Sequence, residues 1–178
     1  THWGVSGPAI LKLSSYAART LAENDYKSPL AISWTDKLPR HEVESCLLKF
    51  QAANLRKQVA NLHPFGLPSR LWLYILSKLD IDAGKPWAEI GRKTLNRMIE
   101  TLVNDQYTIA GKGAFREEFV TCGGVSLSSV NSKTLESKVC PNLFFAGEVL
   151  DIDAITGGFN LQAAWTTGVV AGQCAAGS

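Results

Sequence analysis

Two adjacent glycines near the carboxyl end of the chain occupy the position of a ligand-binding turn. Gly157 and Gly158 follow an apolar, strand-like run at 142–147 and precede a helix-like run of small and apolar residues. Because glycine has no Cβ atom, a planar or polyanionic ligand can approach its backbone closely. The first N–H groups of a helix lack partners within the helix, and the helix dipole favours negative charge there. The pattern therefore predicts backbone contact with a ligand, and a plain glycine turn is the alternative.

Polar side chains flank this glycine turn. Glu148 follows the strand-like run, at the carboxyl end where open α/β sheets place their ligands. A carboxylate there suits hydrogen bonding to the hydroxyls of a ribose or a ribitol chain, and a solvated carboxylate is the alternative. Asn160 and Gln162 either cap the helix or contact the polar edge of a ring. Asp153 either fixes the loop or contacts the ligand; we predict no metal site, because the loop offers too few convergent oxygens.

The elements that must position these residues lie on both sides of a helical block. Before the block, Gly4 and Gly7 predict a turn, Pro8 suits the first position of a helix, and alternation at 28–35 predicts a strand. After the block, we expect strands at 107–113, 118–127 and 142–149, and a helix at 157–172. One side of this last helix is expected to carry Leu161, Ala164, Trp165, Gly168 and Val169.

The block itself, 37–112, has the periodicity of a small helical bundle. Helices are expected over about 43–62, 69–79 and 86–103, with Pro64 and Gly66 as breakers between the first two. Short connections between helices are typical of bundles. The apolar core is expected to include Phe50, Leu55, Leu71, Leu76, Leu95 and Ile99.

Composition narrows the class of protein. The chain has 178 residues, of which 46% are hydrophobic and 19% charged, as in a packed globular domain. A net charge of +2 is too small to predict nucleic acid as a partner. No apolar run approaches the roughly 18 residues needed to span a bilayer, so no membrane association is expected. The four cysteines form no C-x-x-C pair, which favours idle thiols in the cytoplasm or another reducing compartment.

The first residue is Thr1 rather than methionine, and a motif begins at once. We therefore expect a piece of a longer protein. Any organelle-targeting peptide would precede Thr1, so an organelle is the alternative to the cytoplasm.

Five motifs resemble those of one family of flavoproteins. The stretches "TCGGV" (121–125), "TLESK" (134–138), "LFFAGEVLD" (143–151) and "TGGFNLQ" (156–162) are similar to T-x-G-G-V, T-M-E-S-K, L-x-F-A-G-E-x-L-D and T-G-G-Y-N-L-Q. These patterns describe the aminoacetone-oxidase-like family of FAD-binding flavoproteins. The stretch "THWGVSGPAILKLS" (1–14) resembles that family's T-H-x-G-x-S-G-P-A motif. The motifs stand in the family's order, and the resemblance covers nearly the whole chain.

The resemblance implies an α+β fragment with a discontinuous architecture. A Rossmann-like FAD-binding domain would be interrupted by a β-barrel-like domain, itself interrupted by the helical bundle. Residues 1–36 and 113–134 would form the barrel-like part, 37–112 the helical insert, and 135–178 the last strand and helix of the Rossmann-like domain. No G-x-G-x-x-G follows a strand in this sequence, so the pyrophosphate anchor is expected before Thr1.

The resemblance also assigns residues to an FAD site. His2 becomes a candidate catalytic residue near the flavin, with a histidine that only fixes the turn as the alternative. Ala154 stands where the family usually has glycine, a departure that would stiffen the loop. Together with Asp153, the residues expected to bind the cofactor are Gly147, Glu148, Thr156, Gly157, Gly158, Phe159, Asn160 and Leu161.

Two functions follow as hypotheses. The first is the C-terminal portion of an FAD-dependent oxidoreductase, in which the flavin transfers hydride or electrons and the protein places it. NAD(P)H is a candidate electron donor, the substrate is an unknown small molecule, and the fragment alone is expected to be inactive. Its other partner would be the N-terminal half of the same protein or another chain at the exposed sheet edge. The second hypothesis is a non-catalytic interaction module that recognises a partner through the bundle.

Overall fold

The computed structural model describes residues 4–113 and 120–177. The chain divides into two compact units. The first contains Thr1–Lys27 and Ala110–Ser178, and the second contains Ser28–Ile109.

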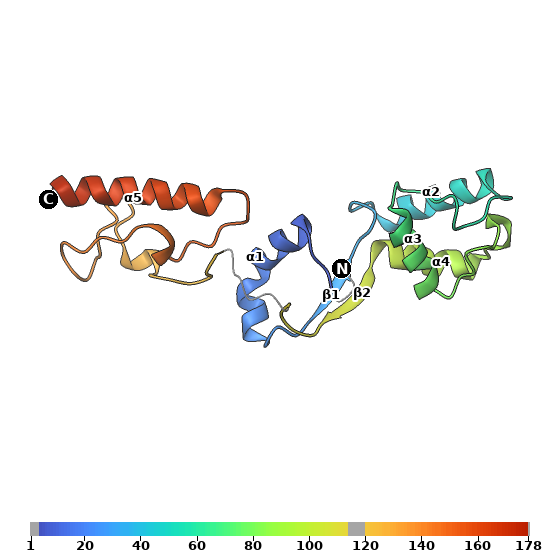
Figure 1. Ribbon diagram of the computed structural model, residues 1–178, viewed down its shortest axis with the longest axis horizontal. Coiled ribbons are helices and arrows are strands. Elements are labelled where there is room, and N and C mark those ends of the chain that lie inside the picture. Colours follow the sequence, from blue (N-terminus) through green and yellow to red (C-terminus); the bar gives the residue numbers. More distant parts are fainter. Residues whose placement is uncertain (1–3, 114–119, 178) are drawn as a thin grey trace. The chain divides into compact units, whose positions relative to one another are not determined.

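The second unit begins and ends with a two-stranded antiparallel ribbon. Strand β1 (Ser28–Ile32) pairs with β2 (Asp105–Ile109), so that Ser28 lies opposite Ile109 and Ile32 opposite Asp105 (Figure 1). β1 covers the first part of the strand expected at 28–35. Across the described residues these two strands form one open sheet rather than a closed barrel, so the expectation of a β-barrel-like domain is wrong for this part of the chain.

Helices fill the rest of the second unit. They are α2 (Arg40–Ala53), α3 (Ser69–Lys78) and α4 (Arg92–Val103), with a short 3-10 helix, η1 (Trp87–Glu89), before α4 (Figure 1). The predicted bundle is therefore present, but two of its helices are shorter than expected.

Local capping explains both differences. α2 ends at Ala53, well before the expected end at residue 62, because the Asn54 side chain donates a 2.8 Å hydrogen bond to the carbonyl of Phe50. The expected helix over 86–103 is divided at Gly91, whose extended backbone (φ −74°, ψ 165°) precedes the first turn of α4.

The bundle core is apolar and contains two indole rings. The side chains of Trp72 and Trp87 are fully buried, and their N–H groups donate to the carbonyls of Val59 (2.6 Å) and Leu62 (3.0 Å). The predicted core residues Leu76, Leu95 and Ile99 are buried, while Phe50 and Leu71 pack on the core from partly buried positions. The prediction for Leu55 is wrong: it is 48% exposed, because α2 ends before it.

The first unit contains a long helix at each end of its sequence. Helix α1 (Pro8–Glu23) starts as the sequence predicts, with Gly7 in a positive-φ conformation (+100°) and Pro8 at the first helical position. Helix α5 (Phe159–Gly177) follows the glycine turn. Between them lie two short 3-10 helices, η2 (Leu127–Ser129) and η3 (Gly147–Val149). Across the described ranges, no helix combines the length and apolar character that would cross a bilayer.

The strands expected at 118–127 and 142–149 are not formed in the described residues. Isolated bridges take their place, pairing Val125 with Leu150 and Glu136 with Phe144. A strand needs neighbouring strands to bind its N–H and C=O groups, and local sequence does not reveal whether those neighbours are present. The apolar residues of these segments instead build a small core around Val130, Leu135, Leu150 and Ala171.

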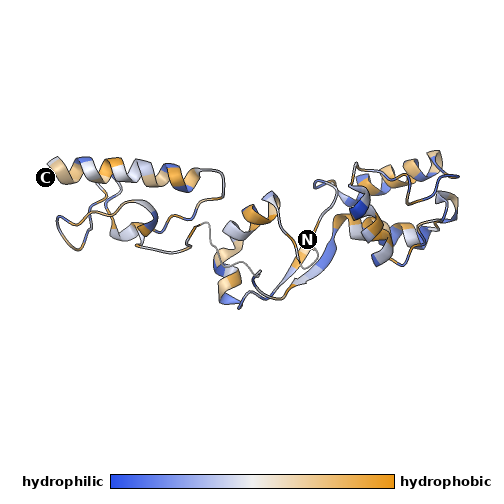
Figure 2. Cartoon of the chain, in the orientation of Figure 1, coloured by the Kyte–Doolittle hydropathy of each residue, from blue (hydrophilic) through white to orange (hydrophobic). Residues whose placement is uncertain are grey.

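Helix α5 contains no charged residue, and orange and pale segments prevail over blue ones on the side that Figure 2 shows. Ala171 is buried, whereas Leu161, Trp165 and Val169 are 66%, 72% and 57% exposed. The large apolar side chains expected on one side of this helix are thus left largely uncovered within this unit. Small residues line the packed side instead, because they let the helix approach the backbone of η3.

Candidate functional site

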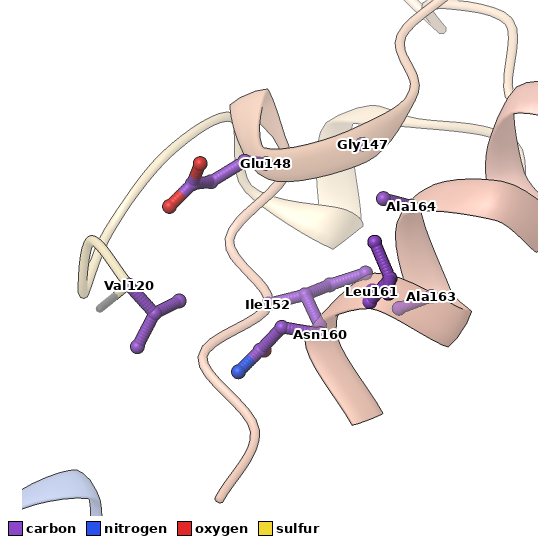
Figure 3. Close-up of a pocket in the computed structure, with 8 residues that line it drawn as sticks. All are labelled: Val120, Gly147, Glu148, Ile152, Asn160, Leu161, Ala163 and Ala164. Atoms are coloured by element: carbon purple, nitrogen blue, oxygen red, sulfur yellow. The ribbon is translucent and has the colours of Figure 1, made fainter. Parts of the chain in front are cut away.

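A pocket of about 250 Å³ lies between η3 with its following loop and the first turns of α5. In Figure 3, Glu148 and Val120 lie on one side of the pocket, and Leu161, Ala163 and Ala164 on the helix side. Eight residues line it: Val120, Gly147, Glu148, Ile152, Asn160, Leu161, Ala163 and Ala164.

The pocket brings together part of the predicted site. Four residues expected to bind the cofactor line it, namely Gly147, Glu148, Asn160 and Leu161. The other five, Asp153, Thr156, Gly157, Gly158 and Phe159, lie in the adjoining loop and at the helix start, outside the lining. Their role as cofactor contacts stays a prediction, as does the catalytic role of His2, which lies outside the described residues.

The glycine turn has the backbone conformation that the sequence suggested. Gly157 and Gly158 have φ values of +145° and +89°, in a region that residues with a Cβ atom rarely adopt. Phe159, the first residue of α5, is 57% exposed. The turn is therefore sharply bent, and it presents an aromatic ring to solvent rather than to the packed side of the helix.

One end of the η3 segment is bound by a threonine of α5. The N–H of Gly147 donates a 2.9 Å hydrogen bond to Oγ1 of Thr167, and this hydroxyl donates in turn to the carbonyl of Ala163 (2.7 Å). Gly147 has φ +75°, which places its N–H toward the helix at no steric cost. Sequence reasoning missed Thr167, because a hydroxyl inside a helix carries no local signal of a contact twenty residues away.

The other end of the same loop is bound by Asn160. Its Oδ1 accepts from the N–H of Ala154 and its Nδ2 donates to the carbonyl of Ala154, both at 2.8 Å. The amide thus fixes the loop, a role that differs from the two expected for it, capping the helix or contacting the polar edge of a ring. Ala154 does not have a positive φ, so its replacement of the usual glycine places no strain on this backbone.

Glu148 lies at the rim of the pocket. It is exposed, and its Oε1 accepts a 3.1 Å hydrogen bond from the N–H of Thr121. The carboxylate therefore connects η3 to the segment around Val120, which also lines the pocket. This position suits an acceptor for ligand hydroxyls, since the carboxylate oxygens remain reachable from solvent.

Beside the pocket, Asp151 and Asp153 face a cation. Arg19 of α1 donates to Asp151 at 2.8 Å, and its guanidinium lies 3.9 Å from Asp153. These carboxylates raise the pKa of Arg19, first through the hydrogen bond to Asp151. A hydrogen bond to Asp153, followed by desolvation, raises the pKa of the Cys122 thiol. Asp153 thus has protein partners that fix the loop, which was one of the two roles expected for it.

Gly124 allows two backbone segments of the first unit, 124–125 and 149–151, to lie in direct contact. Val125 N–H donates to the carbonyl of Val149 (2.8 Å), and Asp151 N–H donates to the carbonyl of Val125 (3.0 Å). A Cβ atom on Gly124 would lie 2.6 Å from the carbonyl oxygen of Val149, at a φ of +153°. The motif T-C-G-G-V contains this glycine, but sequence alone does not show what it approaches.

A second polar cluster lies in the other unit, at the bundle end of the ribbon. Asp105, only 3% exposed, accepts hydrogen bonds from Lys78 (2.5 Å), Tyr107 (2.5 Å) and Trp34 (3.0 Å). The Lys78 ammonium also lies 3.9 Å from the centre of the Tyr107 ring. Burial, and then hydrogen bonding to Asp105 and Tyr74, raise the pKa of Tyr107. The cluster connects β2 and Trp34, which follows β1, to α3.

Within the described ranges, no group of three or more His, Cys, Asp or Glu side chains is arranged to hold a metal ion. The four cysteines are free thiols. The chemistry of the site therefore depends on a turn, a carboxylate and a helix start around a small pocket.

A glycine turn at the start of a helix is also found at the ligand sites of nucleotide-binding proteins of the Rossmann class. Comparison with known proteins shows this class. The family described as HI0933-like protein Rossmann domain matches residues 9–174, and the chain belongs to this family.

Three curated relatives are similar over most of this chain. Proteins named ribosomal RNA dihydrouridine synthase, from Haemophilus influenzae and Escherichia coli, are 29% and 30% identical over 167 residues, which is 94% of this chain and 39% of each relative. A 3-dehydro-bile acid delta(4,6)-reductase from Clostridium scindens is 30% identical over 179 residues, 99% of this chain and 43% of the relative. The chain thus spans about two fifths of the length of these relatives (39% to 43%).

Proposed function

We propose that these 178 residues are the C-terminal part of an FAD-dependent oxidoreductase and contribute one wall of its flavin site. The observation that carries the proposal is the pocket between η3 and α5, formed by four of the predicted cofactor residues in a chain of the HI0933-like Rossmann family. The finer placement in the aminoacetone-oxidase-like family rests on the motif resemblance.

The size of the pocket favours a partial site. Its volume of about 250 Å³ lies below the roughly 300–1,000 Å³ that hold a drug-sized ligand. A whole FAD molecule is too large for this pocket. The lining nevertheless fits part of a flavin, since Ile152 and Leu161 offer apolar contact and Glu148 an acceptor. The rest of the FAD, including its pyrophosphate, would be held by residues outside this chain, in the N-terminal half of the same protein.

When bound, FAD would supply the hydride or electron transfer. The residues of this chain would hold and orient it: Glu148 through ribityl or ribose hydroxyls, and Leu161 and Ile152 by keeping water from one side of it. Gly157 and Gly158 would let the backbone approach the cofactor from the adjoining loop. No residue of this chain is assigned a proton transfer, since His2 is the sole candidate and lies outside the described part.

The names of the relatives suggest which class of reaction the proposed enzyme catalyses. Both dihydrouridine and the product of a delta(4,6)-reductase result from adding hydrogen across a carbon–carbon double bond. We therefore assign the proposed enzyme to reductases of activated carbon–carbon double bonds, with NAD(P)H as the proposed electron donor. The free cysteines support a reducing compartment as its place of action.

Two measurements test the proposal. The protein expressed from the complete reading frame should be yellow and bind FAD, whereas the 178-residue chain should purify colourless and bind FAD with a Kd well above about 1 μM. The reason is that Glu148 and the start of α5 together contribute at most ~5 kcal/mol of binding free energy, whereas a micromolar Kd requires about 8 kcal/mol. A longer protein that binds no FAD would refute the function, and a yellow 178-residue chain would refute the division of the site.

A further inference from the structure

The segment 147–154 is held to α5 at both of its ends. At one end, the N–H of Gly147 donates to Oγ1 of Thr167. At the other, Ala154 exchanges two hydrogen bonds with the Asn160 amide. Between these ends, Val125 exchanges backbone hydrogen bonds with Val149 and Asp151, and Leu150 is 1% exposed. The segment is therefore fixed at three points along its length.

The pocket lies between this segment and the helix that holds it. Gly147, Glu148 and Ile152 come from the segment, and Asn160, Leu161, Ala163 and Ala164 come from α5 (Figure 3). Seven of the eight lining residues thus belong to the two elements that the side chains of Asn160 and Thr167 join. The length of these two contacts sets the distance between the walls.

We infer that Asn160 and Thr167 are positioning residues that fix the width of the pocket for the part of the flavin it receives. The inference rests on the proposed function. Both polar atoms of the Asn160 amide are bonded to Ala154, and the Thr167 hydroxyl donates to the helix and accepts from Gly147. Each side chain therefore affects the cofactor by holding the segment 147–154 in place, and not by a direct hydrogen bond to the flavin ring.

The chain offers a matched control for each residue. Thr166 stands next to Thr167, but its hydroxyl bonds only with Gln162, through the carbonyl and the side-chain amide. Thr167→Val removes the hydroxyl that holds Gly147, and Thr166→Val removes a hydroxyl of the same helix that does not touch the segment. Asn160→Leu has the corresponding control Gln173→Leu, which removes an exposed amide further along the same helix.

The experiment uses the protein from the complete reading frame and measures its Kd for FAD and the visible spectrum of bound FAD. Thr167→Val and Asn160→Leu should each raise the Kd by about tenfold, as expected for the loss of a partly buried hydrogen bond, and should shift the flavin absorption band. Thr166→Val and Gln173→Leu should leave both unchanged, and Thr167→Ser should retain normal binding. A Thr167→Val protein that binds FAD with the wild-type Kd and spectrum would overturn the inference.

A double variant tests whether the two contacts hold the same segment. If they do, each contact is weakened when the other is lost, so the combined effect on Kd should be smaller than the product of the two single effects. Effects that multiply fully would mean two independent local contacts, and the inference of a shared positioning role would fail.

Amide exchange separates this inference from the proposed function. In the protein without FAD, the Gly147 amide should exchange faster in Thr167→Val than in Thr166→Val. Absence of FAD binding by the wild-type protein would refute the function alone. Equal exchange of the Gly147 amide in the two variants would refute the positioning role alone.

Discussion

At the scale of single residues, the structure explains why one glycine of the first unit cannot be replaced. Gly124 lies so close to the backbone of Val149 and Leu150 that a Cβ atom would be 2.6 Å from one and 2.8 Å from the other. Both neighbours are backbone atoms, which cannot rotate away. The glycine is thus required by the contact it makes as well as by its own φ angle.

Gly124→Ala should therefore lower the free energy of unfolding of the first unit by at least about 1 kcal/mol, since alanine is strained at positive φ and would also clash. Gly168→Ala is the control, because a methyl group at this position of helix α5 would meet no heavy atom of another element within 4 Å. Alanine there should stabilise by about 0.5–1 kcal/mol. Urea denaturation measures both changes, and a destabilisation of equal size in the two variants would contradict the prediction.

Tyr107 gives a residue-scale prediction about pH. Its pKa in the folded state is raised, so the phenol stays protonated and donates to Asp105 above the pH, about 10, at which an unfolded tyrosine ionises. A raised pKa contributes stability that is complete below about pH 10 and is lost as the pH rises toward the folded-state pKa. Tyr107→Phe should thus cost about 1 kcal/mol at about pH 8, and this cost should shrink above about pH 10. Urea denaturation of both proteins from about pH 8 to about pH 11 measures it, and a cost that grows with pH would contradict the assignment.

At the scale of elements, the sequence predicted the helices and the ribbon strand β1, but not the fate of the strands expected at 118–127 and 142–149. The start of α1 follows from Gly7 and Pro8, whose preferences are local. The run at 142–149 has the composition of a buried strand, but a strand forms only with partners, and in this chain the run ends in the 3-10 helix η3. The end of α2 depends on the amide of Asn54, and its early position moved Leu55 from the expected core to the surface.

The candidate site shows the same division between local and long-range signals. Gly147, Glu148, Asn160 and Leu161 were predictable because a motif contains them and a glycine turn lies beside them. Thr167 was not, since its function depends on an N–H twenty residues earlier in the chain.

The bundle core supplies an element-scale prediction. Leu95 is 3% exposed in the core, whereas Leu55 is 48% exposed beyond the end of α2. Leu95→Ala should lower the free energy of unfolding by about 2–5 kcal/mol, and Leu55→Ala by less than about 0.5 kcal/mol. Thermal and urea denaturation of the two variants measure the difference. A similar cost for both would mean that α2 continues through residue 55.

At the scale of the whole molecule, the exposed side of α5 affects how the chain behaves in solution. Large apolar side chains on a helix are normally buried against another element, and Trp165 is 72% exposed within its unit. In the proposed enzyme, the missing half of the protein would cover this side. Contiguous apolar surface otherwise favours association between copies.

The 178-residue chain should therefore self-associate, and Trp165→Arg should shift it toward the monomer. Tyr16→Arg is the control, because Tyr16 is 77% exposed on α1 and this substitution also removes an exposed aromatic ring. Sedimentation over a range of concentrations measures the change. If Trp165→Arg left the association unchanged, or if Tyr16→Arg reduced it equally, the contact between copies would not lie on the exposed side of α5.

The pairing of Ser28 with Ile109 has a consequence for how such a protein can be altered. The chain leaves the first unit at Ser28 and returns to it at Ile109, and these two residues are paired. Residues 33–104 can therefore be exchanged without moving the two ends of the first unit apart. A version in which an Asn-Gly turn joins Ile32 directly to Asp105 would close β1 and β2 into a hairpin. The bundle can therefore be exchanged as one unit, and enzymes of the proposed kind could differ in this insert while keeping the same first unit.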